Sequence, residues 1–122
     1  MAREYLDFLN DIVVAMGQVE RLLAGMTFQQ LAEDEQKILA VTKAVENIDG
    51  AAKRVPPEVR ARYPEIEWRD MAGTRDRVAH GYFEVDLAVL WRVGTEIVPR
   101  LKPEMERVLA AEVRAREDEG QG

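Results

Sequence analysis

Residues 35–55, which read EQKILAVTKAVENIDGAAKRV, carry the clearest structural pattern in this chain. Apolar side chains recur there at spacings of three and four, as they do along one face of an α-helix. They are Ile38, Val41, Val45, Ile48, Ala52 and Val55. Asp34 stands just before the run and can cap its first turn. Pro56-Pro57 end it, because proline lacks an amide hydrogen and disfavours a helical residue before it. The pattern predicts a long helix with one buried face.

The segment before this helix repeats the pattern. Apolar residues between Glu4 and Ala24 are spaced by three or four positions, which predicts a second long amphipathic helix. Gly25 suits the end of that helix, since glycine adopts the left-handed conformation that often closes one. Thr27 and Gln30 have the spacing of a capping box, so a short helix is expected to begin there.

The segment after residue 57 reads as shorter helices. We expect one at residues 58–63 and another at residues 65–79, in which Gly73 is a weak point. Gly81 is expected to close the second of these helices.

The last third of the chain predicts two further helical pieces. Asp86 is a candidate N-cap for a run that starts at Leu87 and carries its apolar residues on one face. Pro99 and Pro103 are expected to divide this run from a final amphipathic piece, because proline interrupts a helix interior. Residues 114–122 are polar and are expected to fray.

These elements predict an all-α fold. No segment shows the strict alternation of a half-buried strand, and the connections are short enough for neighbouring helices to pack near-antiparallel. We therefore expect a bundle of four or five main helices that forms one domain over residues 1–113, followed by the polar tail 114–122. The long apolar stripes could also bury a second face in a homodimer.

Composition narrows the function. The 122 residues contain no cysteine and one histidine, which argues against a structural zinc site, and we expect no metal or other cofactor. No apolar run approaches the roughly 20 residues of a membrane span, so a cytoplasmic protein is expected. The net charge of −6 argues against broad nucleic-acid binding, but basic residues gather in the middle of the chain. They are Lys53, Arg54, Arg60, Arg62, Arg69, Arg75 and Arg77.

The residues that could carry chemistry lie between Trp68 and Phe83. Arg75 could grip a phosphate with its planar guanidinium, and His80 titrates near neutral pH. Together they favour metal-free cleavage of RNA, in which the 2′-hydroxyl is the nucleophile, a histidine moves a proton and an arginine stabilises the transition state. On a continuous helix the two residues are about 140° apart, so they converge only if the helix ends before His80 or if the site is a dimer seam. The alternatives are a structural histidine and an arginine paired with a nearby acid.

Arg75-x4-His80-x-Tyr82 resembles the R-x4-H-x-Y signature of the HEPN superfamily. The chain as a whole resembles the HepT-like toxins of the HEPN–MNT toxin–antitoxin systems. The resemblance covers residues 5–103 and rests on landmarks in a fixed order. These landmarks are Tyr5-Leu6-x-Phe8-Leu9-x-Asp11-Ile12, Gly25-Met26-Thr27-Phe28, Tyr63-Pro64-x-Ile66-x-Trp68, His80-Gly81-Tyr82-Phe83, Asp86, Trp91 and Val98-Pro99-x-Leu101.

The resemblance implies a helical-bundle homodimer in which the two motifs line a cleft. It implies a metal-independent ribonuclease with Arg75 and His80 as the catalytic pair. It further implies a type VII toxin–antitoxin pair, in which a minimal nucleotidyltransferase (MNT) antitoxin neutralises the toxin by attaching AMP to Tyr82, in a complex that could assemble beyond the dimer. The added bulk and negative charge would exclude an RNA phosphate. Arg69 and Arg77, which flank the motif arginine, are candidate RNA-binding residues. Without the resemblance, Tyr82 reads as an aromatic residue packed against Trp91.

Two positions depart from the family's pattern. Asp76 follows the motif arginine where many relatives have asparagine, and Asp49-Gly50-Ala51 replaces Gly-Glu-Ala after the isoleucine of the long helix. These departures favour a second interpretation, in which the chain binds RNA or a nucleotidyltransferase without cleaving anything. A third interpretation is a purely structural helical dimer.

Overall fold

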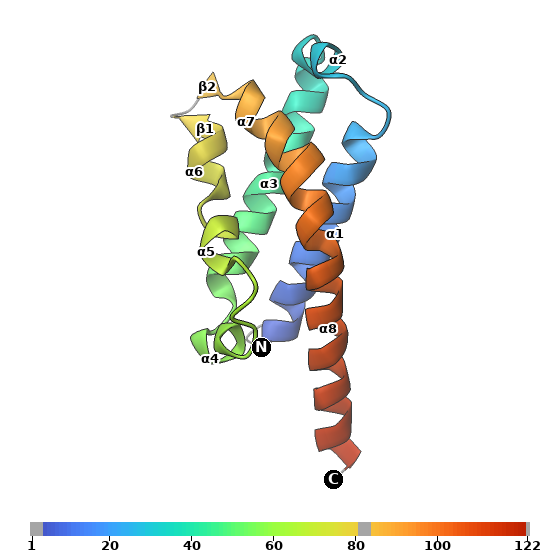
Figure 1. Ribbon diagram of the computed structural model, residues 1–122, viewed down its shortest axis with the longest axis vertical. Coiled ribbons are helices and arrows are strands. Elements are labelled where there is room, and N and C mark those ends of the chain that lie inside the picture. Colours follow the sequence, from blue (N-terminus) through green and yellow to red (C-terminus); the bar gives the residue numbers. More distant parts are fainter. Residues whose placement is uncertain (1–3, 81–83, 122) are drawn as a thin grey trace.

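The computed structural model describes residues 4–80 and 84–121. Three long helical stretches form the bundle (Figure 1). They are α1 (Tyr5–Leu23), α3 (Glu35–Arg54), and a C-terminal stretch of α7 (Leu87–Arg92), the π-helical turn η1 (Val93–Ile97) and α8 (Val98–Gln121). α1 packs against both α3 and α8, so it is the central helix of the three. This arrangement confirms the predicted all-α bundle.

The start and stop signals act as the sequence predicts. Gly25 has φ of +75° just after α1. The Thr27 hydroxyl accepts from the Gln30 amide at 3.1 Å, and the Gln30 side chain accepts from the Thr27 amide at 2.9 Å, which makes the capping box of α2 (Phe28–Ala32). Asp34 caps α3 through the Lys37 amide. α4 (Pro57–Ala61) follows the proline pair.

The core runs along the apolar stripes of the three long stretches. Its largest fully buried side chains come from every part of the bundle and include Leu9, Ile12, Met16, Leu31, Met71, Leu90 and Met105. The residues predicted to face inward from α3 are buried, apart from the partly buried Ile38. The periodicity therefore identified the buried faces correctly.

The segment between α4 and α7 differs from the prediction. Residues 65–79 do not form one helix but two short ones, α5 (Trp68–Met71) and α6 (Thr74–Val78), separated by Ala72 and Gly73. A small antiparallel pair of strands follows, in which β1 (Ala79–His80) faces β2 (Glu84–Val85). The expectation of no strands was wrong here, because two-residue strands are too short to show an alternating pattern. Gly81 lies outside the described residues.

The C-terminal helix also differs from the prediction. Pro99 and Pro103 do not divide it, since α8 includes both. Pro99 is the second residue of α8 and follows the π-helical turn η1. The α-helical hydrogen-bond pattern is already interrupted there, so the missing amide hydrogen of Pro99 does not end the helix. The polar segment expected to fray is helical as far as Gln121, and α8 extends past the rest of the bundle in Figure 1.

One glycine is required by the packing of η1 on α1. A Cβ atom added at Gly94 would overlap the Leu23 side chain and would lie 3.3 Å from Cγ1 of Val19. Leu23 and Val19 are both buried, so they have little freedom to move aside. Gly94 therefore lets the C-terminal stretch approach α1 closely.

Candidate active site

The helix that carries Arg75 ends before His80. α6 stops at Val78, and Ala79 has extended backbone angles, φ −119° and ψ 125°. The Asp86 amide donates to the Val78 carbonyl at 2.7 Å, which fixes the turn into the strand pair. The helix is therefore not continuous from Arg75 to His80, which meets the condition that the sequence set for the two residues to converge. The side chain of His80, and all of Tyr82, lie outside the described part of the chain.

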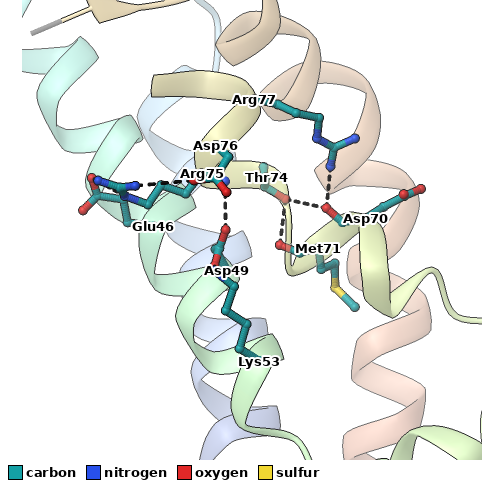
Figure 2. Close-up of polar contacts among 9 residues, drawn as sticks. All are labelled: Glu46, Asp49, Lys53, Asp70, Met71, Thr74, Arg75, Asp76 and Arg77. Carbon is teal, nitrogen blue, oxygen red and sulfur yellow. Dashed lines mark hydrogen bonds and ion pairs between the residues drawn. The ribbon is translucent and has the colours of Figure 1, made fainter. Parts of the chain in front are cut away.

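Asp49 of α3 holds the start of α6. Its Oδ2 accepts from the Arg75 backbone amide at 3.0 Å, and its Oδ1 lies 2.7 Å from Nζ of Lys53 (Figure 2). Only 3% of the Asp49 side chain is exposed. The hydrogen bond to this carboxylate raises the pKa of the Lys53 ammonium. The backbone amides in the first turn of a helix have no partner within that helix and favour a negative acceptor. In α6 the Asp49 carboxylate of α3 is the acceptor for the Arg75 amide.

The break between α5 and α6 is closed by Thr74. Its buried hydroxyl lies 2.9 Å from the Asp70 carbonyl and 2.8 Å from the Met71 carbonyl, both at the end of α5. A hydroxyl that reaches back to such carbonyls satisfies groups that the end of a helix leaves unpaired. Thr74 and Asp49 thus fix the position of Arg75 from two sides.

The Arg75 side chain is loosely held. Its Nε lies 3.9 Å from Oε1 of Glu46, and its Nη1 lies 3.5 Å from Oδ1 of Asp76. About half of the side chain is exposed, 51%, and the Asp76 carboxylate is more exposed still. Exposed ion pairs at such distances contribute little free energy. The guanidinium is therefore held near α3 but can exchange these carboxylates for a phosphate.

The two candidate RNA-binding arginines do not extend this site. Arg77 donates to the Asp70 carbonyl and points to the opposite side of α6 from Arg75 (Figure 2). It lines a groove of about 640 Å³ between α5–α6 and the C-terminal stretch, together with Arg92 and Arg100. Arg69 is exposed on α5. A role for Arg69 or Arg77 in RNA binding remains a prediction, and Arg77 would have to act from this other groove.

Sequence reasoning missed a basic residue on the Arg75 side. Lys43 of α3 lies 4.0 Å from the Glu46 carboxylate that Arg75 also contacts. Both Lys43 and Arg75 line a pocket of about 360 Å³ between α3 and the strand pair. Lys43 and Glu46 are three positions apart on a predicted helix, so the sequence places them on one face. Nothing in the sequence indicates that this face lies beside Arg75.

Trp91 does have an aromatic partner among the described residues. Its ring meets the Phe28 ring edge to face, with centroids 6.1 Å apart. This contact joins α7 to α2. The alternative in which Tyr82 packs on Trp91 stays open, because Tyr82 is not described.

Comparison with known proteins shows the family to which this helical bundle belongs. The family model for ribonuclease HepT-like proteins matches residues 12–108. The chain belongs to this HEPN-type family. It is 37% identical over 108 residues to a protein of Thermococcus cleftensis named "Probable ribonuclease HepT". The matched region covers 88% of this chain and 98% of that protein.

More distant relatives agree with this assignment. Proteins named "Putative RNase" in Methanocaldococcus jannaschii and Caldanaerobacter subterraneus are 30% and 29% identical, over 88% and 77% of this chain. The matches cover 88% and 83% of those proteins. No solved structure matches the chain. Within the described residues, no helix is both long and apolar enough to cross a membrane.

Proposed function

We propose that this chain is a metal-independent RNA endonuclease and the toxin of a type VII toxin–antitoxin pair. One observation carries the proposal: in a member of the HepT-like family, α6 ends between Arg75 and His80, and Arg75 is half exposed beside weakly bound carboxylates. An RNA substrate implies action in the cytoplasm. The active unit is a homodimer whose two motifs face one cleft.

The chemistry follows from the roles of the two side chains. His80 takes the proton of the ribose 2′-hydroxyl or returns one to the leaving 5′-oxygen. Arg75 stabilises the charge that develops on the phosphate oxygens in the transition state. Because the attacking hydroxyl belongs to the substrate, proximity within the RNA replaces a bound nucleophile. The product is a 2′,3′-cyclic phosphate.

The ribonuclease proposal is tested with purified protein and RNA in EDTA. The wild-type chain should cleave and leave a 2′,3′-cyclic phosphate, whereas His80→Ala and Arg75→Ala should each lose most of the rate, on the order of 100-fold or more. Circular dichroism should show unchanged helix content in both variants. Full cleavage by His80→Ala would remove His80 from the mechanism.

We further propose that a minimal nucleotidyltransferase antitoxin switches the protein off by transferring AMP to Tyr82. The added phosphate would bring negative charge to the motif and compete with RNA for Arg75. Co-expression with a nucleotidyltransferase encoded beside the gene should give one AMP adduct in intact-mass spectra. Tyr82→Phe should lack the adduct and stay active. An adduct on another residue would contradict the assignment.

The second candidate is a module that binds RNA or the nucleotidyltransferase without cleavage. The specific observation in its favour is Asp76, whose carboxylate lies 3.5 Å from the Arg75 guanidinium and repels phosphate. Asp76→Asn separates the two proposals. If the wild type binds RNA without turnover and Asp76→Asn cleaves it, the wild-type chain is the non-cleaving module.

A further inference from the structure

A pocket beside Arg75 has a mixed lining. It lies between α3 and the strand pair, and its volume of about 360 Å³ falls within the roughly 300–1,000 Å³ of small-ligand sites. Leu39, Ala79 and Val85 supply apolar surface. Leu39 is 61% exposed, which is more than any other large apolar side chain in the described part of the chain. An exposed leucine beside a half-exposed arginine favours a ligand with one apolar and one anionic part.

The charged part of the lining has two cations and two carboxylates, and both cations lie beside the same carboxylate, Glu46. Lys43 and Arg75 approach the two oxygens of Glu46 from different elements, at 4.0 Å and 3.9 Å. Neither distance is that of a hydrogen bond, and the Lys43 side chain is 71% exposed. Such pairs are weak, so both cations are available to an anion with better geometry. A phosphodiester offers that geometry to an arginine and adds charge contacts for a lysine.

A third feature suits a nucleobase. Glu84 of β2 also lines the pocket, and a carboxylate accepts hydrogen bonds from amino groups on base edges. Proteins recognise single-stranded RNA through unstacked bases that contact apolar or aromatic surface while their edges are hydrogen-bonded. The apolar surface, the Glu84 acceptor and the two cations together thus match one nucleotide and its flanking phosphates.

We propose that this pocket is a subsite for one nucleotide of single-stranded RNA, next to the phosphate that Arg75 holds. Lys43 contacts the neighbouring phosphate of the strand, and Leu39 and Val85 contact the face of the base. This inference rests on the proposed ribonuclease function and extends it. It makes Lys43 and Leu39 substrate-binding residues on α3, a helix outside the R-x4-H motif.

Binding and cleavage are measured separately so that the two proposals can fail independently. The binding probe is a fluorescein-labelled 2′-fluoro RNA oligonucleotide of mixed sequence, which lacks the nucleophilic hydroxyl, followed by anisotropy. Lys43→Ala should weaken binding about fivefold and make the slope of log K against log salt shallower by about 0.7. Leu39→Ser should weaken binding to a similar extent and leave the salt slope unchanged. In cleavage of ordinary RNA, both losses should fall on KM rather than kcat.

Lys102→Ala is the matched control. Lys102 lies on α8, pairs with Glu20 at 3.2 Å, and gives the same change of net charge when removed. It should leave the RNA affinity and its salt slope unchanged. If the wild type cleaves RNA but Lys43→Ala and Leu39→Ser bind like the wild type, the subsite is wrong and the ribonuclease proposal stands. If Leu39→Ser instead changes the mass measured by light scattering, with RNA affinity unchanged, the pocket is a protein interface. A wild type that neither binds nor cleaves RNA overturns both proposals.

Discussion

Asp49 connects a buried charge with the candidate active site. A buried carboxylate is costly unless it is paired and hydrogen-bonded, and here Lys53 and the Arg75 amide supply both. The motif arginine is therefore held through its backbone, by a residue 26 positions earlier in the chain. The Asp49-Gly50-Ala51 segment therefore places an acidic side chain against the backbone of the motif.

We expect Asp49→Ala to reduce both stability and activity. It leaves an amide at the start of α6 without its charged acceptor, which should lower the free energy of unfolding by about 2 kcal/mol in urea denaturation. It should also reduce kcat for RNA cleavage at a temperature where the variant is folded, because Arg75 loses its fixed position.

Asp34→Ala is the control for this prediction. Asp34 caps α3 away from the motif, and its loss should cost about 1 kcal/mol without lowering kcat. Equal loss of kcat in both variants would show that activity follows overall stability and would remove the positioning role of Asp49.

Among the elements, η1 sets how closely the C-terminal stretch meets α1. Gly94 lies against Leu23 and Val19, so a methyl group there overfills the contact. Gly94→Ala should lower the free energy of unfolding by about 1–3 kcal/mol. Gly50→Ala, in the exposed part of α3 with nothing within 4 Å of the added methyl, should raise it by up to about 1 kcal/mol. In thermal denaturation, Gly94→Ala should therefore melt below the wild type and Gly50→Ala above it. A stabilised Gly94→Ala variant would refute the close approach.

Among the elements, the sequence predicted those helices whose bounds depend on local apolar periodicity and on capping or stop residues. The long helices, the caps at Thr27, Asp34 and Asp86, and the stop at Gly25 are local features, and the structure confirms them. The strand pair is only two residues long on each side and has no periodicity to read. The helix continues through Pro103 in α8, which packs against α1, and such a tertiary contact is not visible in the local sequence.

The candidate site was predictable only in part, for the same reason. The motif placed Arg75 and His80 close in sequence, but the Asp49 cap and the Lys43 side of the pocket arise from tertiary contacts between α3 and α6. Arg77 and Arg75 are close in sequence, but residues two apart on a helix point in different directions. Tertiary position, and not residue type, separates the two arginines.

At the scale of the whole molecule, Glu112 joins α8 to the segment after α4. This buried residue of α8 accepts from Arg62 at 2.5 Å and from the Tyr63 hydroxyl at 2.6 Å. Burial alone would raise the pKa of Glu112, but hydrogen bonds from Arg62, Tyr63 and Tyr5 outweigh it and hold the pKa below its ordinary range. Burial, followed by the hydrogen bond to Glu112, raises the pKa of Tyr63 to about 12. The cluster anchors α8 to the segment after α4.

This cluster predicts a stability that falls in acid. Because the folded pKa of Glu112 lies below the unfolded one, its contribution is present above about pH 4.5 and is lost as the pH falls through the folded value. Glu112→Gln should be less stable than wild type by about 2 kcal/mol at pH 7, and the difference should shrink toward pH 3. Urea midpoints across this range measure it. Glu106→Gln, on the exposed face of the same helix, should show little difference at any pH. A constant deficit for Glu112→Gln would contradict the prediction.

The hydrogen bond from the Arg75 amide to Asp49 also makes the nitrogen of that amide a probe of local opening at the start of α6. Exchange of that amide hydrogen with deuterated water requires the start of α6 to lift from α3, since its acceptor is a buried carboxylate. Its exchange rate, read in a nitrogen-15 spectrum, measures how often the start of α6 separates from α3 while the bundle stays folded. Neither turnover nor denaturation resolves that local opening.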